Sequence, residues 1–139
     1  MAETQGPANA GQINLGPNEN GEALTVTFQE DAAISAATSS SGDGGTVLVG
    51  AETVTLKGNG SLSTRSTGLG PAGDVSIQTG GQFRVQDGAR VEVSGEGTGD
   101  SGTLEVISGI TILDDGLLLA STQAGEDGYI RLQIEDALV

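Results

Sequence analysis

Short runs of alternating apolar and polar residues recur along this chain, and five of them begin with the same phrase. The phrase is a glycine, a variable residue, an apolar residue, a second variable residue and another apolar residue. Its five glycines, called the anchor glycines below, are Gly11, Gly45, Gly73, Gly102 and Gly128. All ten apolar slots hold Ile, Leu or Val, and the glycines are spaced by 34, 28, 29 and 26 residues. The pattern therefore predicts an internal repeat of about 29 residues.

Two more apolar phrases follow the first one in most of the units. The second reads apolar–polar–apolar at residues 26–28, 54–56, 83–85 and 110–112, and the third follows a polar break at 60–62, 88–93 and 116–119. Alternation of this kind, rich in β-branched residues and interrupted by Gly, Asn and Asp, indicates short strands that bury one face. Helices are not expected, because an interior glycine costs a helix roughly 1 kcal/mol.

The predicted fold is an all-β, right-handed parallel β-helix, also called a β-solenoid. We expect residues 1–139 to form one domain of about four to five coils of ~29 residues, with three short strands per coil. Right-handedness follows from the preferred chirality of parallel crossovers. The competing fold is an antiparallel sandwich or barrel, in which Asn59-Gly60, Asp87-Gly88 and Asp115-Gly116 would be hairpin turns. A sandwich does not require the three-strand unit to repeat.

Stacking of the coils also predicts which first-strand residues share a row. Ile77 and Val106 should point inward within apolar ladders. The outward row should contain Asn14, Leu48, Ser76, Glu105 and Arg131. Glu105 and Arg131 are expected to lie on adjacent coils as an exposed ion pair.

Composition narrows the possible chemistry. The chain has 19 acidic and 5 basic residues, a formal net charge of −14, and neither Cys nor His. A disulfide framework, a thiolate nucleophile, a Ser-His-Asp triad and the usual zinc sites are thereby excluded. Nucleic acid is not an expected partner because its phosphates would be repelled, and no apolar run is long enough for helical membrane insertion.

An acidic loop row raises the possibility of calcium. The residues two positions before the anchor glycines are Asn9, Asp43, Pro71, Asp100 and Glu126. Stacking would bring Asp100 and Glu126 onto adjacent coils about 5 Å apart. The predicted calcium candidates are therefore Asp43, Asp100 and Glu126, and no other cofactor is expected. Pro71 interrupts the row, so acidic turns that are simply solvated remain the alternative interpretation.

Two other patterns suggest different functions. Asp114-Asp115 is a carboxylate pair of the type that a polysaccharide-active enzyme would need, although two aspartates before a glycine also fit a turn. Thr27, Thr55 and Thr111 are predicted to share an outward row, as in ice-binding solenoids, but Arg84 interrupts that row. Neither pattern is sufficient to predict an enzyme or an ice-binding protein.

Four segments of the repeats have a recognisable sequence, namely Gly70–Ile77, Phe83–Val85, Gln86–Ser94 and Leu118–Gly125. They resemble the coils of filamentous-haemagglutinin-like exoproteins, which are exported by two-partner secretion, in the version common in cyanobacteria. The resemblance covers roughly residues 6–132, and the first coil is looser, with an insertion around Pro17–Glu22.

This resemblance implies a non-catalytic structural or adhesive segment of a secreted or outer cell-surface protein. Its implied partners are adjacent coils of a longer parent solenoid and a host-cell or matrix glycan. The secretion domain of the family is not visible, so the chain is expected to be a fragment of a longer array. The alternative is a binding module whose acidic loop edge binds calcium or glycan.

Overall fold

A computed structural model of the 139-residue chain describes residues 1–4, 8–16 and 24–139. Within these ranges all regular structure is β-strand. The strands are β1 (Ala2–Thr4), β2 (Ile13–Leu15), β3 (Thr25–Phe28), β4 (Ala33–Thr38), β5 (Val47–Leu56), β6 (Ser61–Ser66), β7 (Val75–Gln86), β8 (Arg90–Gly95), β9 (Leu104–Asp114), β10 (Leu117–Thr122) and β11 (Ile130–Leu138). The predicted insertion around Pro17–Glu22 lies outside the described residues.

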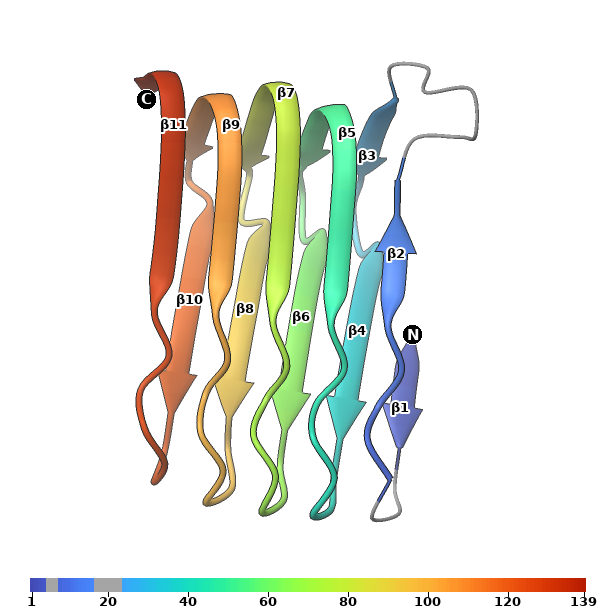
Figure 1. Ribbon diagram of the computed structural model, residues 1–139. Helices are drawn as coiled ribbons and strands as arrows, with labels where there is room; N and C mark the ends of the chain where they lie inside the picture. Colours follow the sequence, from blue (N-terminus) through green and yellow to red (C-terminus); the bar gives the residue numbers. More distant parts are fainter. Residues whose placement is uncertain (5–7, 17–23) are drawn as a thin grey trace.

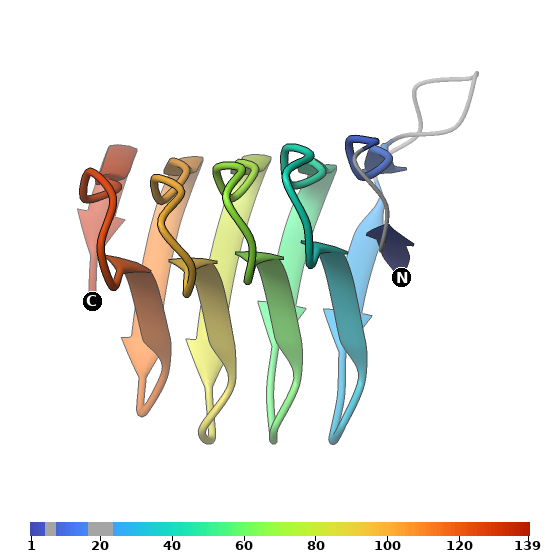
Figure 2. The same ribbon diagram turned by 90° about the horizontal axis from the view of Figure 1, so that it is seen from below.

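The strands form two parallel sheets that run along a solenoid of about four turns. One sheet has the order β1-β4-β6-β8-β10, and the other has the order β11-β9-β7-β5-β2, with β3 also pairing with β5. In Figure 1 the long strands rise at the front, bend back at the top and descend behind, while the chain advances from right to left. This path is right-handed, and Figure 2 shows the same coils from below. The predicted right-handed parallel β-solenoid is confirmed, and the alternative prediction of an antiparallel sandwich or barrel is wrong.

In the second, third and fourth coils, the first and second predicted strands are joined into one long, bent strand, whereas β2 and β3 are separate strands in the first coil. β5, β7 and β9 each contain both phrases, and β11 extends in the same way past the corner. Register shifts mark the bend, between Ala51 and Thr53 in β5 and between Gln78 and Gln82 in β7. Glycines at these corners permit a sharp bend without ending the strand, as at β-bulges.

Inward ladders of the first phrase hold the coils together. Val47 pairs with Val75 and Val75 with Leu104, while Val49 pairs with Ile77 and Ile77 with Val106. Ile77 and Val106 are fully buried, as predicted. The outward row is also confirmed, because Ser76 pairs with Leu48 and Glu105, Asn14 with Leu48, and Arg131 with Glu105.

The anchor glycines lie where the backbones of neighbouring coils are in direct contact. A Cβ atom added to Gly73 would overlap the carbonyl oxygen of Gly45, and one added to Gly102 would overlap that of Gly73. The same relation holds for Gly128 over Gly102 and for Gly45 over Gly11. A second row, which the repeat phrase did not predict, behaves likewise and contains Gly42, Gly70, Gly99 and Gly125. The glycine repeat is therefore a packing requirement of the coil spacing.

The second phrase of the fourth coil lies in the opposite register from the prediction. Thr111 pairs with Phe83 and is fully buried, while Ile112 pairs with Arg84 on the outward row and is half-buried. Ile110 lies four residues after Val106, whereas in β5 the inward Val54 lies five residues after Val49. The inward position of β9 therefore falls on Thr111, because a shift of one residue moves a side chain to the other face. The Thr111 hydroxyl is satisfied by the Ser108 hydroxyl at 2.6 Å. The predicted outward placement of Thr111 is wrong.

Candidate functional site

The acidic loop row, which contains Asp43, Pro71, Asp100 and Glu126, stacks from coil to coil as predicted, along the edge of loops at the bottom of Figure 1. Backbone hydrogen bonds connect the coils there: Ala72 N donates to Asp100 O at 2.9 Å, and Ser101 N donates to Glu126 O at 3.1 Å. Gly44 N donates to Pro71 O at 2.8 Å, which places Pro71 between Asp43 and Asp100. The structure therefore brings Asp100 and Glu126 onto adjacent coils and leaves Asp43 two coils from Asp100.

The side chains of this row form hydrogen bonds with neighbouring coils. Asp43 Oδ2 accepts from Asn9 Nδ2 at 3.2 Å, and Asp100 Oδ1 accepts from the backbone N–H of Glu126 at 2.8 Å. In residues 1–4, 8–16 and 24–139, no three acidic side chains gather as a metal cluster. Calcium at Asp43, Asp100 and Glu126 stays a prediction.

Asp114 and Asp115 lie at a turn that the coils share. Asp115 has a positive φ of 57°, and the equivalent positions Glu30, Gly58 and Asp87 have φ values of 53°, 62° and 56°. Gly88 N donates to Asp115 O at 2.8 Å, so this turn is part of the stacking between coils. Asp tolerates the left-handed conformation better than most residues. This geometry accounts for the aspartate pair as a turn, without assigning it chemistry.

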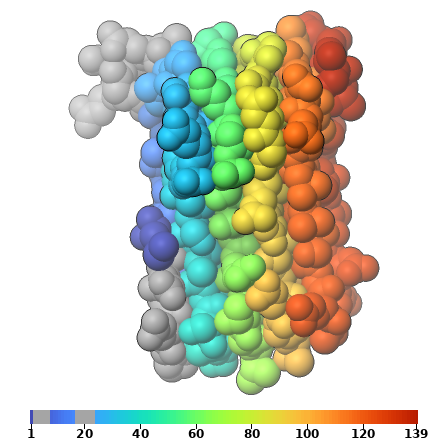
Figure 3. All heavy atoms as spheres, turned by 180° about the vertical axis from the view of Figure 1, so that it is seen from behind, coloured from blue at the N-terminus to red at the C-terminus, as the bar shows by residue number. Residues whose placement is uncertain are grey.

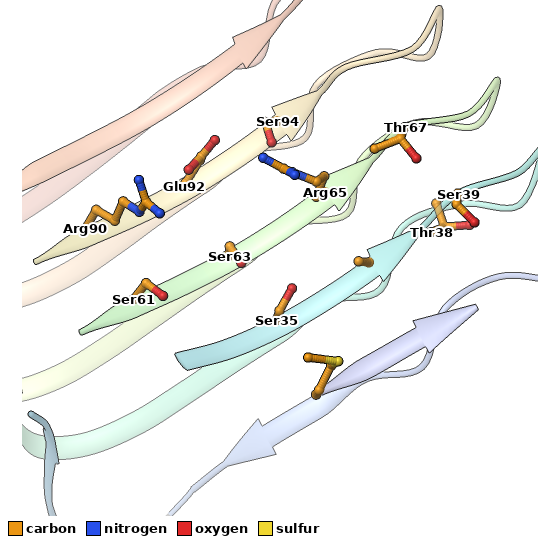
Figure 4. A pocket seen from close by; sticks show the side chains of 12 residues that line it. Ser35, Thr38, Ser39, Ser61, Ser63, Arg65, Thr67, Arg90, Glu92 and Ser94 are labelled. Carbon is orange, nitrogen blue, oxygen red and sulfur yellow. The ribbon is translucent and has the colours of Figure 1, made fainter. Parts of the chain in front are cut away.

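A shallow groove of about 430 Å³ crosses the outward face of β4, β6 and β8. Strand alternation directs Ser61, Ser63 and Arg65 outward, while Leu62, Thr64 and Ser66 are fully buried. The floor is formed by small hydroxyl side chains, including Ser35, and the longer side chains stand on β6 and β8 (Figure 4). Figure 3 shows the coils in contact as parallel stripes on the rear of the molecule. Hydroxyl and charged side chains make up most of the groove lining, and Met1 and Ala37 add apolar surface to it.

Two of the five basic residues of the chain line this groove. Arg65 Nη2 lies 2.7 Å from Glu96 Oε1, in an ion pair whose side chains are 48% and 36% exposed. Arg90 stands opposite Ser61 on the neighbouring strand, and no ion pair holds it within the described part of the chain. Glu92 is on the same face of β8, opposite Ser63. The groove therefore carries one paired cation, one unpaired cation and one carboxylate among hydroxyl groups.

One hydroxyl beside the groove has an unsatisfied hydrogen-bonding capacity. Ser94 lines the groove and is 3% exposed, and its buried Oγ has no hydrogen-bond partner among the described residues. It pairs with Arg65 across the strands, and Figure 4 shows the Arg65 side chain reaching toward β8 beside it. A buried hydroxyl without a partner costs about 1–3 kcal/mol.

Sequence reasoning did not predict this groove. Arg65 and Arg90 lie 25 residues apart in the chain, so their positions alone do not place them together. Arg65 and Arg131 form ion pairs with residues of neighbouring coils, Glu96 and Glu105, and the predicted pair of Glu105 and Arg131 is confirmed. The available signal was the run of small outward residues in the third phrases of two successive units, facing longer charged residues in the next unit.

Comparison with family models, with curated proteins and with solved structures gives no match to this chain. Among the described residues there is no helix that is long and apolar enough to cross a membrane. The fold and the groove define the chain as a right-handed parallel β-solenoid with a polar groove on one sheet.

Proposed function

We propose that this chain is a non-catalytic structural and adhesive segment of a secreted or cell-surface adhesin of the filamentous-haemagglutinin-like type. The observation that supports the proposal most strongly is the parallel pairing of β5, β7 and β9 on both sides of each corner, with a register shift at the corner itself. Stacked coils of this kind make a stiff rod that repeats its outward rows at steps of about 4.8 Å. A stiff rod with polar faces is suited to holding a binding surface away from a cell.

Catalysis is not part of the proposal. The chain has no His or Cys, and Asp114-Asp115 is explained by the left-handed turn at Asp115. A retaining or inverting glycosidase needs two carboxyl groups on either side of a substrate, about 5–9.5 Å apart. The turn aspartates have a structural explanation that requires no substrate.

Adhesion is tested with beads coated with the folded chain. Coated beads should bind to cell monolayers or to deposited extracellular matrix several times more than beads carrying the Ile77→Asp variant, which we expect to be unfolded. Ser76→Asp, which alters only the outward face, is the matched control and should bind like the parent chain. Equal binding by folded chain and Ile77→Asp beads would contradict an adhesive role.

Surface location is tested on the cells from which the chain comes. An antibody raised against the folded chain should label intact, unpermeabilised cells or the culture medium. Labelling that requires permeabilisation would contradict the proposed location.

A further inference from the structure

The sheet-face groove offers hydrogen-bonding groups of three kinds within one hollow. Ser61 and Ser63 supply hydroxyls that both donate and accept, and Glu92 supplies an acceptor. Arg90 supplies a guanidinium that has no ion-pair partner in residues 1–4, 8–16 and 24–139. A guanidinium binds a carboxylate through two parallel N–H···O bonds. The volume of about 430 Å³ is within the range of about 300–1,000 Å³ that small-molecule sites occupy. The groove therefore matches a compact ligand with several hydroxyls and one negative group.

The buried Ser94 hydroxyl points independently to a missing partner at the same place. Its Oγ forms no hydrogen bond within the described part of the chain, and the neighbouring side chain that extends beside it is Arg65. Arg65 is half exposed, and its pair with Glu96 is a solvent-exposed ion pair, a type that contributes little to stability. A small displacement of Arg65 is therefore inexpensive and would let a ligand hydroxyl reach Ser94 Oγ.

The charge of the whole chain limits how acidic the ligand can be. A net charge of −14 repels highly sulfated polymers and nucleic acids. A ligand with a single carboxylate is repelled less than such a polymer, and its carboxylate would replace water at the Arg90 guanidinium. Sugar hydroxyls match the serine floor and Glu92.

We propose that the groove formed by β4, β6 and β8 binds a hexuronic acid residue of a glycan, with its carboxylate on Arg90 and its hydroxyls on Ser61, Ser63 and Glu92. The proposal rests on the adhesive function proposed above, and it names the ligand class of that function. Binding of a single residue is weak, in the range of ~1–10 mM, because the groove is shallow. Repetition of the residue along a glycan raises the overall avidity.

The probe for the experiment is methyl β-D-glucuronide, with methyl β-D-glucoside as the neutral control. Titration into the isotope-labelled chain should shift the backbone amide NMR signals of Ser61, Ser63 and Arg90 in a saturable way. The glucoside should bind at least 5-fold more weakly. Absence of saturable shifts at 50 mM probe, or equal binding of the two sugars, would overturn the proposal.

Two variants separate recognition from general charge effects. Arg90→Gln should weaken glucuronide binding about 10-fold, whereas Arg131→Gln, which removes an exposed arginine from the other sheet, should leave it unchanged. Ser94→Ala should weaken binding several-fold while the melting temperature stays the same or rises. If Arg131→Gln has the same effect as Arg90→Gln, the interaction is nonspecific and the assigned site is wrong.

The outcomes also separate this proposal from the one on which it rests. Beads that adhere although the glucuronide does not bind would overturn only the ligand assignment. A glucuronide that binds at the groove although the beads do not adhere would overturn only the adhesive function.

Discussion

The central coils and the last coil contain the same apolar phrase but bury it to very different extents. Ile77 and Val106 in β7 and β9 are fully buried, whereas Ile130 and Leu132 in β11 are 41% and 37% exposed. The central residues have a coil on each side, while among the described residues β11 pairs only with β9. In a solenoid the core belongs to the interfaces between coils, so an identical phrase contributes more in the middle than at an edge.

The largest expected difference comes from placing a carboxylate in the two environments. Ile77→Asp buries an unpaired charge and should lower the free energy of unfolding by about 4 kcal/mol or more. Leu132→Asp should cost about 1 kcal/mol, because its side chain keeps access to water. Urea unfolding followed by circular dichroism measures both values. Ser76→Asp, one residue from Ile77 on the outward face, should stay within about 0.5 kcal/mol of the parent chain. Similar costs for Ile77→Asp and Leu132→Asp would refute the comparison.

The anchor glycines provide a second test of the same contrast. Gly102→Ala should cost about 2–3 kcal/mol, because the new methyl group meets the Gly73 carbonyl and the coil is held on both sides. Gly128→Ala meets the Gly102 carbonyl in the same way, but the last coil can shift outward, so we expect about half that cost. Thermal unfolding of both variants gives the comparison. Gly16→Ala is the control and should be nearly neutral, because among the described residues its methyl group would meet only Asn14 Oδ1, at an ordinary contact distance of 3.4 Å.

The exposed apolar residues of the last coil also predict salt-dependent association of the 139-residue chain. One edge of β11, beside Leu132, Leu138 and Val139, pairs with no other described strand, and such edges accept further strands. The charge of −14 opposes association at low salt, and screening removes much of this repulsion. Light scattering from about 10 mM to 1 M NaCl should show an increase in mass. Leu132→Glu should suppress the increase, and an unchanged monomer at every salt concentration would contradict the prediction.

The smallest effect is expected from the ion pair that joins the last two coils. Arg131 Nη1 lies 3.6 Å from Glu105 Oε1, and the two side chains are 63% and 31% exposed. A double-mutant cycle of Arg131→Gln and Glu105→Gln should give a coupling below about 0.5 kcal/mol, decreasing further with salt. A coupling above about 1 kcal/mol would show that the last coil is held more tightly than its exposure indicates.

The repeat phrase was sufficient to predict most of the first strand in each coil. The inward placement of Ile77, the outward row through Ser76 and the adjacency of Glu105 and Arg131 all follow from aligning the glycines. The same alignment predicted the stacking of Asp100 and Glu126 in the loops. These features depend on spacing alone, because parallel coils of similar length must place equivalent residues side by side.

The second phrase was less predictable because it follows a corner. Ile110-Thr111-Ile112 has the expected apolar–polar–apolar pattern, yet Thr111 is the buried residue. One residue fewer at the corner reverses the face, and the hydroxyl of Ser108 compensates for the buried Thr111 hydroxyl. Burying Thr111 requires a hydrogen bond for its hydroxyl and leaves Ile110 and Ile112 partly exposed. The apolar–polar pattern does not show which of these two free-energy terms is larger.

The sequence by itself determined the solenoid, its repeat length and the apolar ladders of its core. A glycine and two alternating apolar residues in every coil leave few other ways to bury the apolar face of these short strands. Only the tertiary structure decided the register after each corner and the grouping of Arg65, Arg90 and Ser94 beside one groove. These three residues belong to two coils. Whether they lie close together depends on how the chain bends at each corner and on the register in which one coil stacks on the next. The sequence shows which residues alternate between the inward and outward faces of a strand. A surface site also depends on which residues of neighbouring coils lie side by side, and backbone contacts between the coils decide this.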